Sequence, residues 1–434
     1  MMSYLKTALV AASALTASFG FATAANAQAF YLQEQSARAA GRAFSGEGAD
    51  TGAASLWWNP AAIAGIETTD VSLSASLILP RGEVANSNTL IRRPGQTFAP
   101  VGGDPVTKNP INNGMLPAFA VAVPVSDRLA FGLAVSSPYS FTTDYAEDSW
   151  ARYTADKTKL LTMDIQPSVA YAVTDWLRAG AALNVEYTDA SLSNALPNLS
   201  AALPDGRQVL KGNGWDFGWS AGVQMHNEFV TVGISYKSAI KHKLDGSIEI
   251  SGLQGPLAAQ NRELDGVSAT FYTPAQIIVG ARFKVSPALT LNTQGIRYTW
   301  SKFDEIRLGA PLNTAIPEGY QNSWSLAGGF DYQASEKLIL RAGVQHASTP
   351  TVDGERDARV PDADRWNFGA GGTVQVNPRL ALDAAFNYVH FDKETIDRTT
   401  AAYAGTAAQT PIVVNGTLRD AKAFIISVGG RMTF

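Results

Sequence analysis

The residues best suited to do chemistry lie in one stretch, Gly218-Trp-Ser-Ala-Gly222, which matches the Gly-x-Ser-x-Gly pattern of serine hydrolases. Asp216 and His226 share the alternating face of Ser220, so the three could supply a nucleophile, a base and an acid. That pattern needs a sharp strand-to-helix turn that exposes the serine. Here Ser220 stands within unbroken alternation, and His226 lies in a turn too far along the chain to activate it. We therefore expect no catalytic residues and no enzyme.

Metal chemistry has equally little support in the sequence. Cysteine is absent, which excludes disulfides and cysteine-ligated metals. His242, His346 and His390 are scattered and are expected in loops or at strand ends. Asp362 and Asp364 are expected to be solvated on an external loop rather than to bind calcium. We expect no metal site and no cofactor.

Composition excludes further classes of protein. The 434 residues carry a net charge of −4, only 17% are charged, and 46% are hydrophobic. Without a basic excess, nucleic acid is not an expected partner. A mean hydropathy near zero does not arise from many apolar runs of about 20 residues, so a helical membrane protein is disfavoured as well. The combination of low charge with abundant glycine and aromatic residues needs another explanation.

Residues 1–27 read as a secretory signal peptide. Lys6 precedes an apolar run, and Ala25-Asn26-Ala27 gives the small-x-small pattern at which a signal peptidase cuts. We expect export, with the mature chain beginning at Gln28.

From residue 70 onward, apolar residues alternate with small or polar ones. Val71, Leu73, Ala75, Leu77 and Leu79 alternate with serines, for example, and the same period of two recurs along the chain. Such strands have one apolar face and one small or polar face.

Short turns alternate strictly with long polar stretches. Six short turns, rich in Asp, Asn, Ser and Pro, each join two such strands, and a first and a last strand bring the count to fourteen. An even number of strands with short turns at one end and long loops at the other is the layout of a transmembrane β-barrel. Residues 70–434 are therefore predicted to form an all-β, antiparallel barrel in the bacterial outer membrane.

In lipid the barrel must close, and its apolar face must point outward. Aromatic residues on that face near strand ends would form the interfacial girdles: Tyr171, Trp215, Tyr236, Trp324, Tyr332, Trp366 and Tyr388. A soluble sandwich or lipocalin-like barrel is the alternative, but its loops would be comparable at both ends. The last strand ends on Phe434, which resembles the signal by which outer-membrane proteins reach their insertion machinery.

Residues 28–69 lack strand alternation and are predicted to form a plug inside the barrel. The segment contains Trp57 and Trp58 just before Asn59-Pro60. As a disordered tail, the alternative, it would leave both tryptophans exposed.

The sequence resembles the FadL/TodX family of outer-membrane transporters for long-chain fatty acids and other hydrophobic compounds. The resemblance rests mainly on Gly41-Arg-Ala-Phe-Ser-Gly-Glu-Gly-Ala49 and on Asn59-Pro60-Ala61, which look like that family's N-terminal hatch. It implies a fourteen-stranded barrel plugged by the hatch. It also implies that Phe30 reaches an internal pocket and that Arg307 pairs with a fatty-acid carboxylate.

The resemblance further implies passive uptake through an extracellular groove, an internal pocket, hatch movement and sideways exit at a kink in the third strand. The third strand alternates from Leu129 to Ser136 and then meets Ser137-Pro138-Tyr139, where proline removes a ladder donor. The kink would open the wall, although Pro138 could also simply mark the rim.

Two alternatives stay open. Around Tyr187 to Asn194 the chain lacks the basic residues of the fatty-acid members, so a neutral aromatic hydrocarbon is a possible cargo. A general diffusion porin is the rival function, although porin lumens are open with charged walls, whereas the inward residues here are mostly small and follow a plug-like segment. The expected partners are the hydrophobic ligand, outer-membrane lipid and lipopolysaccharide, and the insertion machinery, with the protein itself a monomer.

Overall fold

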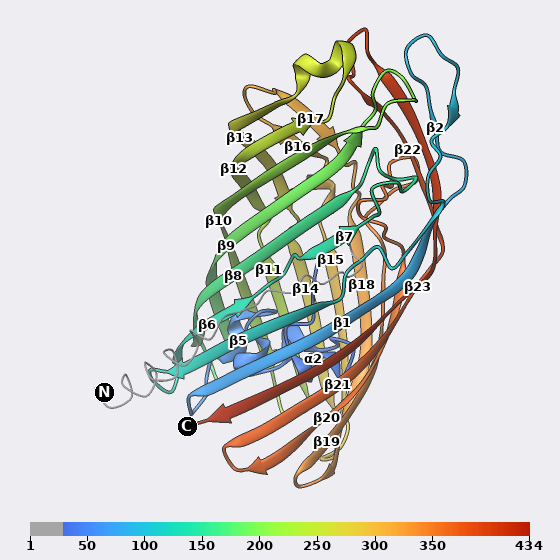
Figure 1. The fold of residues 1–434 in the computed structure, drawn as a ribbon. Helices are drawn as coiled ribbons and strands as arrows, with labels where there is room; N and C mark the ends of the chain where they lie inside the picture. Colours follow the sequence, from blue (N-terminus) through green and yellow to red (C-terminus); the bar gives the residue numbers. More distant parts are fainter. Residues whose placement is uncertain (1–28) are drawn as a thin grey trace.

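In the computed structural model, which describes residues 29–434, fourteen antiparallel strands close into a barrel around residues 29–69 (Figure 1). The first strand, β1 (Asp70–Asn86), pairs with β5 (Gly114–Pro124) on one side and with the last strand, β23 (Thr410–Thr433), on the other. The predicted strand number and closure are confirmed. The predicted signal peptide, residues 1–27, lies outside the described residues.

Between β5 and β23 the wall continues through strands joined at one end by short turns. The third strand is split into β6 (Leu129–Ser136) and β7 (Phe141–Asp144). The others are β8 (Lys157–Ala172), β9 (Leu177–Leu196), β10 (Gly206–His226), β11 (Val230–Lys237) with β12 (Ile240–Ser251), β13 (Arg262–Thr273) with β14 (Gln276–Lys284), β15 (Leu289–Tyr298), β18 (Ser323–Ser335), β19 (Leu338–Ala347), β20 (Arg365–Asn377) and β21 (Leu380–Phe391).

The opposite end of the barrel carries the long loops, which contain short elements of their own. These are β2 (Leu90–Ile91), β3 (Ala99–Pro100), β4 (Val106–Lys108), η5 (Gly255–Gln260), η6 (Trp300–Lys302), β16 (Glu305–Leu308), β17 (Thr314–Pro317) and β22 (Glu394–Ala402). Among residues 29–434, no helix is both long and apolar enough to cross a membrane.

The alternation of the sequence decides which way each side chain points. On β1, Ser72, Ser74 and Ser76 are buried toward the lumen, while Leu73 and Leu77 are 55% and 40% exposed on the outside. The predicted girdle aromatics also lie on the outer face. A barrel with its apolar residues outside is built for lipid, since a soluble barrel would bury them.

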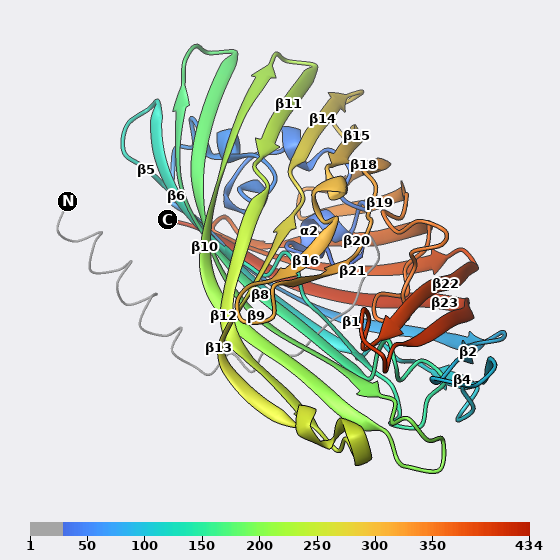
Figure 2. The same cartoon turned by 90° about the horizontal axis from the view of Figure 1, so that it is seen from above.

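Residues 29–69, the predicted hatch, lie within the ring of strands (Figures 1 and 2). It contains the one-turn helix α2 (Ala37–Ala40) and the 3₁₀ turns η2 (Glu47–Ala49), η3 (Ala53–Ser55) and η4 (Pro60–Ile63). We call residues 29–35 the N-terminal segment of the hatch and residues 36–69 the hatch body.

The hatch body fits because the facing wall lacks side chains where the two backbones meet. A Cβ atom at Gly343 of β19 would overlap the carbonyl oxygen of Arg42, and one at Gly233 of β11 would overlap that of Gly48. Glycine at these positions allows the close backbone approach.

Substituting Gly343→Val should therefore loosen the hatch body while leaving the barrel folded. Overpacking of this kind costs about 1–3 kcal/mol. We expect faster proteolytic cleavage within residues 36–69, with the heat-modifiable mobility of the barrel on gels unchanged. Gly328→Val on the outer face of β18, where a Cβ meets no atom within 4 Å, is the matched control. Equal cleavage of the two variants would contradict the close fit.

Candidate functional site

Phe30, in the N-terminal segment, is the centre of a buried aromatic cluster. Its ring centroid lies 5.0 Å from that of Trp300, 5.4 Å from Phe303, 5.7 Å from Phe141 and 6.0 Å from Tyr139. All five side chains are less than 9% exposed. The cluster joins the N-terminal segment, the third strand and the loop after β15 into one apolar core. An apolar molecule that enters this core must take the place of Phe30 or pack beside it.

The N-terminal segment is attached to the wall as a short stretch of β-ladder. The Leu32 amide donates to the Pro138 carbonyl at 2.7 Å, and the Ser140 amide donates to the Phe30 carbonyl at 3.2 Å. These two bonds flank an antiparallel bridge between Tyr31 and Tyr139. The segment thus pairs with the same residues, Ser137 to Ser140, that interrupt the third strand.

That interruption is a bulge with a proline in it. Four residues, 137–140, stand opposite three residues of β8, because Ser136 pairs with Asp164 and Phe141 with Leu160. Side chains replace the missing ladder: the Ser137 hydroxyl donates to the Thr162 carbonyl at 2.6 Å, and the Tyr139 amide donates to the Thr162 hydroxyl at 3.0 Å.

On its other side the bulge leaves a gap in the wall. The ladder between β5 and β6 ends at Phe119, which pairs with Val135, and resumes only at Ile111, which pairs with Thr143. Residues 114–118 of β5 therefore have no strand partner on that side. We call this interval the window.

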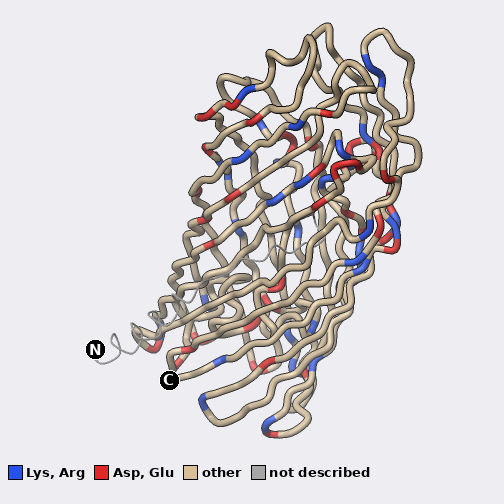
Figure 3. Tube along the Cα trace, viewed as in Figure 1, with Lys and Arg blue, Asp and Glu red and all other residues tan. Residues whose placement is uncertain are grey.

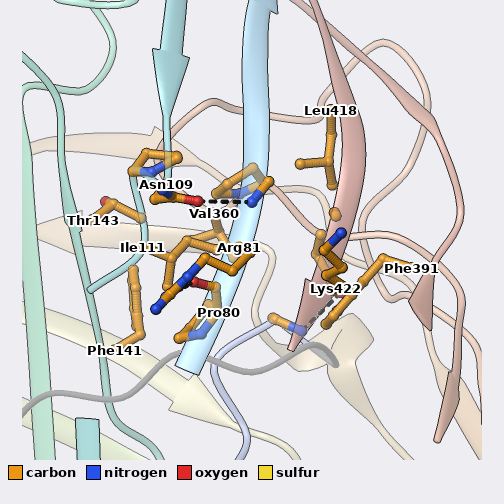
Figure 4. A pocket seen from close by; sticks show the side chains of 16 residues that line it. Pro80, Arg81, Asn109, Ile111, Phe141, Thr143, Val360, Phe391, Leu418 and Lys422 are labelled. Carbon is orange, nitrogen blue, oxygen red and sulfur yellow. Dashed lines mark hydrogen bonds between the residues drawn. The ribbon is translucent and has the colours of Figure 1, made fainter. Parts of the chain in front are cut away.

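Two pockets flank the N-terminal segment. The larger lies beside Ala29 toward the loops (Figure 4). Its lining includes the apolar side chains of Ile111, Phe141, Val360, Phe391 and Leu418 and the charged residues Arg81, Asp362 and Lys422. The smaller lies between Trp57 and Gln35 of the hatch and the inward residues Ala118, Ala134 and Ser136 at the edge of the window. Phe141 contacts both the larger pocket and Phe30.

The Asn59-Pro60-Ala61 motif fixes the hatch body to the wall. Asn59 caps η4 by accepting from the Ala61 amide at 2.9 Å, and Pro60 occupies the first helical position, where no amide is needed. The Asn59 amide group also donates to the carbonyls of Gly48 at 2.7 Å and of Val223 in β10 at 3.2 Å. The motif is therefore structural in this geometry and contacts neither pocket.

A buried ionic network holds the hatch body more strongly. Arg42, whose side chain is 1% exposed, contacts Glu47, Asp50 at 2.5 Å and Asp331 of β18 at 3.1 Å. Arg282 of β14 reaches both Asp50 and Asp331 at 3.2 Å. Burial alone would raise the pKa of Asp50, but Arg282, Arg38 and Arg42 outweigh it and hold that pKa well below the usual range. The network extends to Arg341, Asp383 and Arg431 on the wall.

The N-terminal segment has its own polar anchors near the loops. The Ala29 amide donates to Asp362 at 2.9 Å, and the side-chain amides of Gln33 and Gln345 hydrogen-bond at 2.6 Å. Burial raises the pKa of Glu34 to about 7, although Arg365 opposes this shift. The Ala29–Asp362 and Gln33–Gln345 anchors are hydrogen bonds, whereas those around Arg42 are ion pairs.

Arg307 does not join this site. It lies on β16 with its side chain 69% exposed and paired with Glu305, whereas the neighbouring Ile306 and Leu308 point into the apolar core. Its role in head-group recognition stays a prediction. The structure brings Phe30 and Ser137-Pro138-Tyr139 together and leaves Arg307 apart.

The expectation about Asp362 was wrong, whereas His242 lies near the start of β12, where a strand-end position was expected. Asp362 is 2% exposed and also accepts from the Thr349 hydroxyl at 2.7 Å, so it is an anchor rather than a solvated loop residue. His242 is fully buried between the hydroxyls of Thr188 and Thr273, at 3.2 and 3.1 Å. Asp362 and Ala29 are more than 300 residues apart in the sequence, so no local pattern could reveal their hydrogen bond.

The hydrolase-like motif has no catalytic geometry. Ser220 lies within β10, 1% exposed, and His226 is the last residue of the same strand. At about 3.3 Å per residue, some 20 Å of strand separates them.

Comparison with known proteins extends these observations. The model of the family described as outer membrane protein transport protein (OMPP1/FadL/TodX) matches residues 18–434. A long-chain fatty acid transport protein from Escherichia coli O6:H1 is 25% identical, with 90% of this chain and 92% of that protein covered. Outer membrane protein P1 from Haemophilus influenzae is 26% identical over 85% of this chain and 88% of its own length.

Solved structures show the same fold. A FadL homologue from Pseudomonas aeruginosa gives a TM-score of 0.81 at 23% identity, covering 94% of this chain and all of that one. The toluene transporter TodX from Pseudomonas putida gives 0.66 at 16% identity, again over 94% of this chain and 100% of that one. With the family match over nearly the whole length, the chain belongs to the OMPP1/FadL/TodX family of outer-membrane transporters for hydrophobic compounds, which are not enzymes.

Proposed function

We propose that this protein passively carries a small hydrophobic molecule, either a long-chain fatty acid or a neutral aromatic hydrocarbon, from the outside into the outer membrane itself. The observation that carries the proposal is the pairing of the Phe30–Leu32 stretch with the bulge at Pro138. One short stretch of chain thus both fills the apolar core and lies against the interrupted wall.

In the first step the cargo enters at the larger pocket, beside Ala29. Its lining is mostly apolar, as binding sites for small hydrophobic molecules are. Phe141 forms the link from this pocket to Phe30. Cargo that moves past Phe141 competes with the Phe30 ring for the same aromatic neighbours and so favours release of the N-terminal segment.

In the second step only the N-terminal segment moves. Its ladder consists of two backbone hydrogen bonds, each worth about 0.5–1.5 kcal/mol net. Breaking a buried ion pair of the hatch body costs about 3–5 kcal/mol. Release must also break the Ala29–Asp362 and Gln33–Gln345 hydrogen bonds. It uncovers buried side chains as well, so the cargo must replace the apolar contacts of Phe30 for the segment to move. The several ion pairs around Arg42 gain no such replacement from an apolar cargo.

In the third step the cargo leaves through the window. Release of residues 30–32 uncovers the bulge and joins the core to the smaller pocket, whose wall includes Ala118 and Ser136 at the window edge. A hydrophobic molecule at this level gains by passing into lipid rather than into water. No energy source is needed as long as the cargo is consumed further on.

A general diffusion porin fits less well. Its lumen would be open and water-filled, whereas here the hatch body and its network of charged side chains cross the lumen. Single-channel recordings of this protein should be nearly silent, and large steady ion currents would favour the porin.

Uptake assays in a strain that lacks its own transporter should separate the two cargo classes. A fatty acid needs a cationic partner for its carboxylate, and Arg307 is the expected one. We predict that Arg307→Ala weakens uptake of a long-chain fatty acid several-fold and leaves uptake of a neutral aromatic hydrocarbon unchanged. Parental fatty-acid uptake by the variant would remove Arg307 from the site, and failure of the parent to take up either cargo would refute the function.

Locking the N-terminal segment to the bulge should stop uptake. Tyr31 and Tyr139 form a non-hydrogen-bonded antiparallel pair, and such pairs have Cα atoms about 4.5 Å apart, close enough for a disulfide. The chain has no cysteine of its own. The double variant Tyr31→Cys/Tyr139→Cys should therefore be inactive when oxidised and recover at least tenfold on reduction.

The reduced protein serves as its own control for loss of the two tyrosines. A second control is Ser87→Cys/Thr417→Cys, which joins β23 to the loop end of β1, where the two hydroxyls lie 3.1 Å apart. That disulfide should leave uptake unaffected. Full activity of the oxidised Tyr31/Tyr139 pair would mean that the segment need not move.

Removing the bulge should also stop uptake, without reducing membrane insertion. Deletion of Pro138 leaves three residues opposite three on β8, so the ladder can run on regularly. We expect the folded barrel at parental levels and uptake near background. Deletion of Gly405, in the long loop before β23, is the control. Uptake at the parental rate after loss of Pro138 would argue against sideways exit.

A further inference from the structure

At the closing seam of the barrel, three neighbouring strands present basic side chains in one row. His390 of β21 pairs directly with Lys422 of β23, and Lys422 pairs directly with Arg81 of β1. Alternation puts all three on the outer face, because Leu77 and Ile426, an even number of residues away, are exposed there. Figure 4 shows Arg81 and Lys422 on their adjacent strands.

An aromatic pair fixes the height of this row in the membrane. One step below it on the same face, Tyr388 pairs with Phe424, and their ring centroids lie 5.6 Å apart. Outward aromatic side chains of this kind mark the boundary between hydrocarbon and headgroups. Since the long loops lie on the far side of the row, the row stands at the headgroup level of the outer leaflet.

The row carries positive charge that the protein does not neutralise. Within residues 29–434, neither Arg81 nor Lys422 forms an ion pair, and Arg81 donates only to Asn113 and to the Pro80 carbonyl. Asp420, in the bulge of β23, pairs with neither. Like charges directly opposite each other destabilise a sheet, so an anion bound between the two side chains would relieve this repulsion.

The next row toward the loops shows what neutralisation looks like. There Glu83 of β1 lies between Arg419 of β23, at 3.0 Å, and Lys108 of β4, at 3.7 Å. Charged residues of both signs lie on this side of the barrel near the loop ends, and others lie lower along the strands (Figure 3). Of these two rows, only the row of Arg81, Lys422 and His390 therefore lacks an acidic partner.

We propose that the row of Arg81, Lys422 and His390 binds a phosphate group of the outer leaflet's glycolipid, with the lipid's acyl chains lying against Tyr388 and Phe424. A phosphate of charge near −2 matches the two permanent cations, and a guanidinium can hold it by two parallel hydrogen bonds. A carboxylate from the loops is excluded by position, because the site faces lipid. Arg81 and Lys422 are also among the residues that line the larger pocket, so the row stands at the wall beside the place where cargo arrives.

Native mass spectrometry of the detergent-purified protein tests this assignment. The probes are bisphosphorylated lipid A and the same lipid with both phosphates removed. The parent should bind the phosphorylated form at least tenfold more tightly than Arg81→Ala/Lys422→Ala does, while the dephosphorylated form should bind both equally. Arg128→Ala/Lys337→Ala removes two exposed charges from the short turns and should behave as the parent.

Heat-modifiable mobility shows that each variant is folded, and the exchange Arg81→Lys/Lys422→Arg should retain binding. The proposal fails if Arg81→Ala/Lys422→Ala binds phosphorylated lipid A as the parent does. It also fails if the parent does not distinguish the two lipids, or if the turn variant loses binding to the same extent.

Discussion

The ion pairs that join the hatch body to the barrel are the interaction on which the remaining architecture depends. Arg42 and Asp50 from the hatch meet Arg282 and Asp331 from the wall inside the lumen, where none of the four side chains is more than 19% exposed. Separating them would leave uncompensated buried charges, at about 3–5 kcal/mol for each broken pair. A barrel this wide would otherwise be an aqueous pore, so the network makes a plugged channel out of a sheet.

The fixed hatch body confines motion to a few residues. The N-terminal segment places the ring of Phe30 in the aromatic cluster and pairs with the bulge of the third strand. Its Ala29 amide donates to Asp362 near the loops. It therefore contacts the place where cargo arrives and the place where the wall is interrupted. Coupling between capture and exit needs no long path through the protein, because one stretch of backbone touches both.

Much of the fold follows from local pattern, and much of the site does not. Alternation and turn spacing predict fourteen strands, and the outward set such as Trp215 and Trp366 follows from the period of two. Phe30 and Pro138 could be singled out by resemblance and by the chemistry of proline, but nothing local shows that they pair. Asp362 was misjudged because its burial depends on Ala29, which lies more than 300 positions away in the sequence. The outward turn of Arg307 depends on the register of a short loop strand that alternation over four residues cannot fix.

Hydrogen exchange measured with and without cargo tests the central claim most directly, because the ladder consists of two identifiable amides. The account predicts that the amides of Leu32 and Ser140 lose protection when cargo binds, while those of Arg42, Asn59 and Ala62 in the hatch body keep theirs. Loss of protection throughout residues 36–69, or unchanged protection at Leu32 and Ser140 during active uptake, would contradict it.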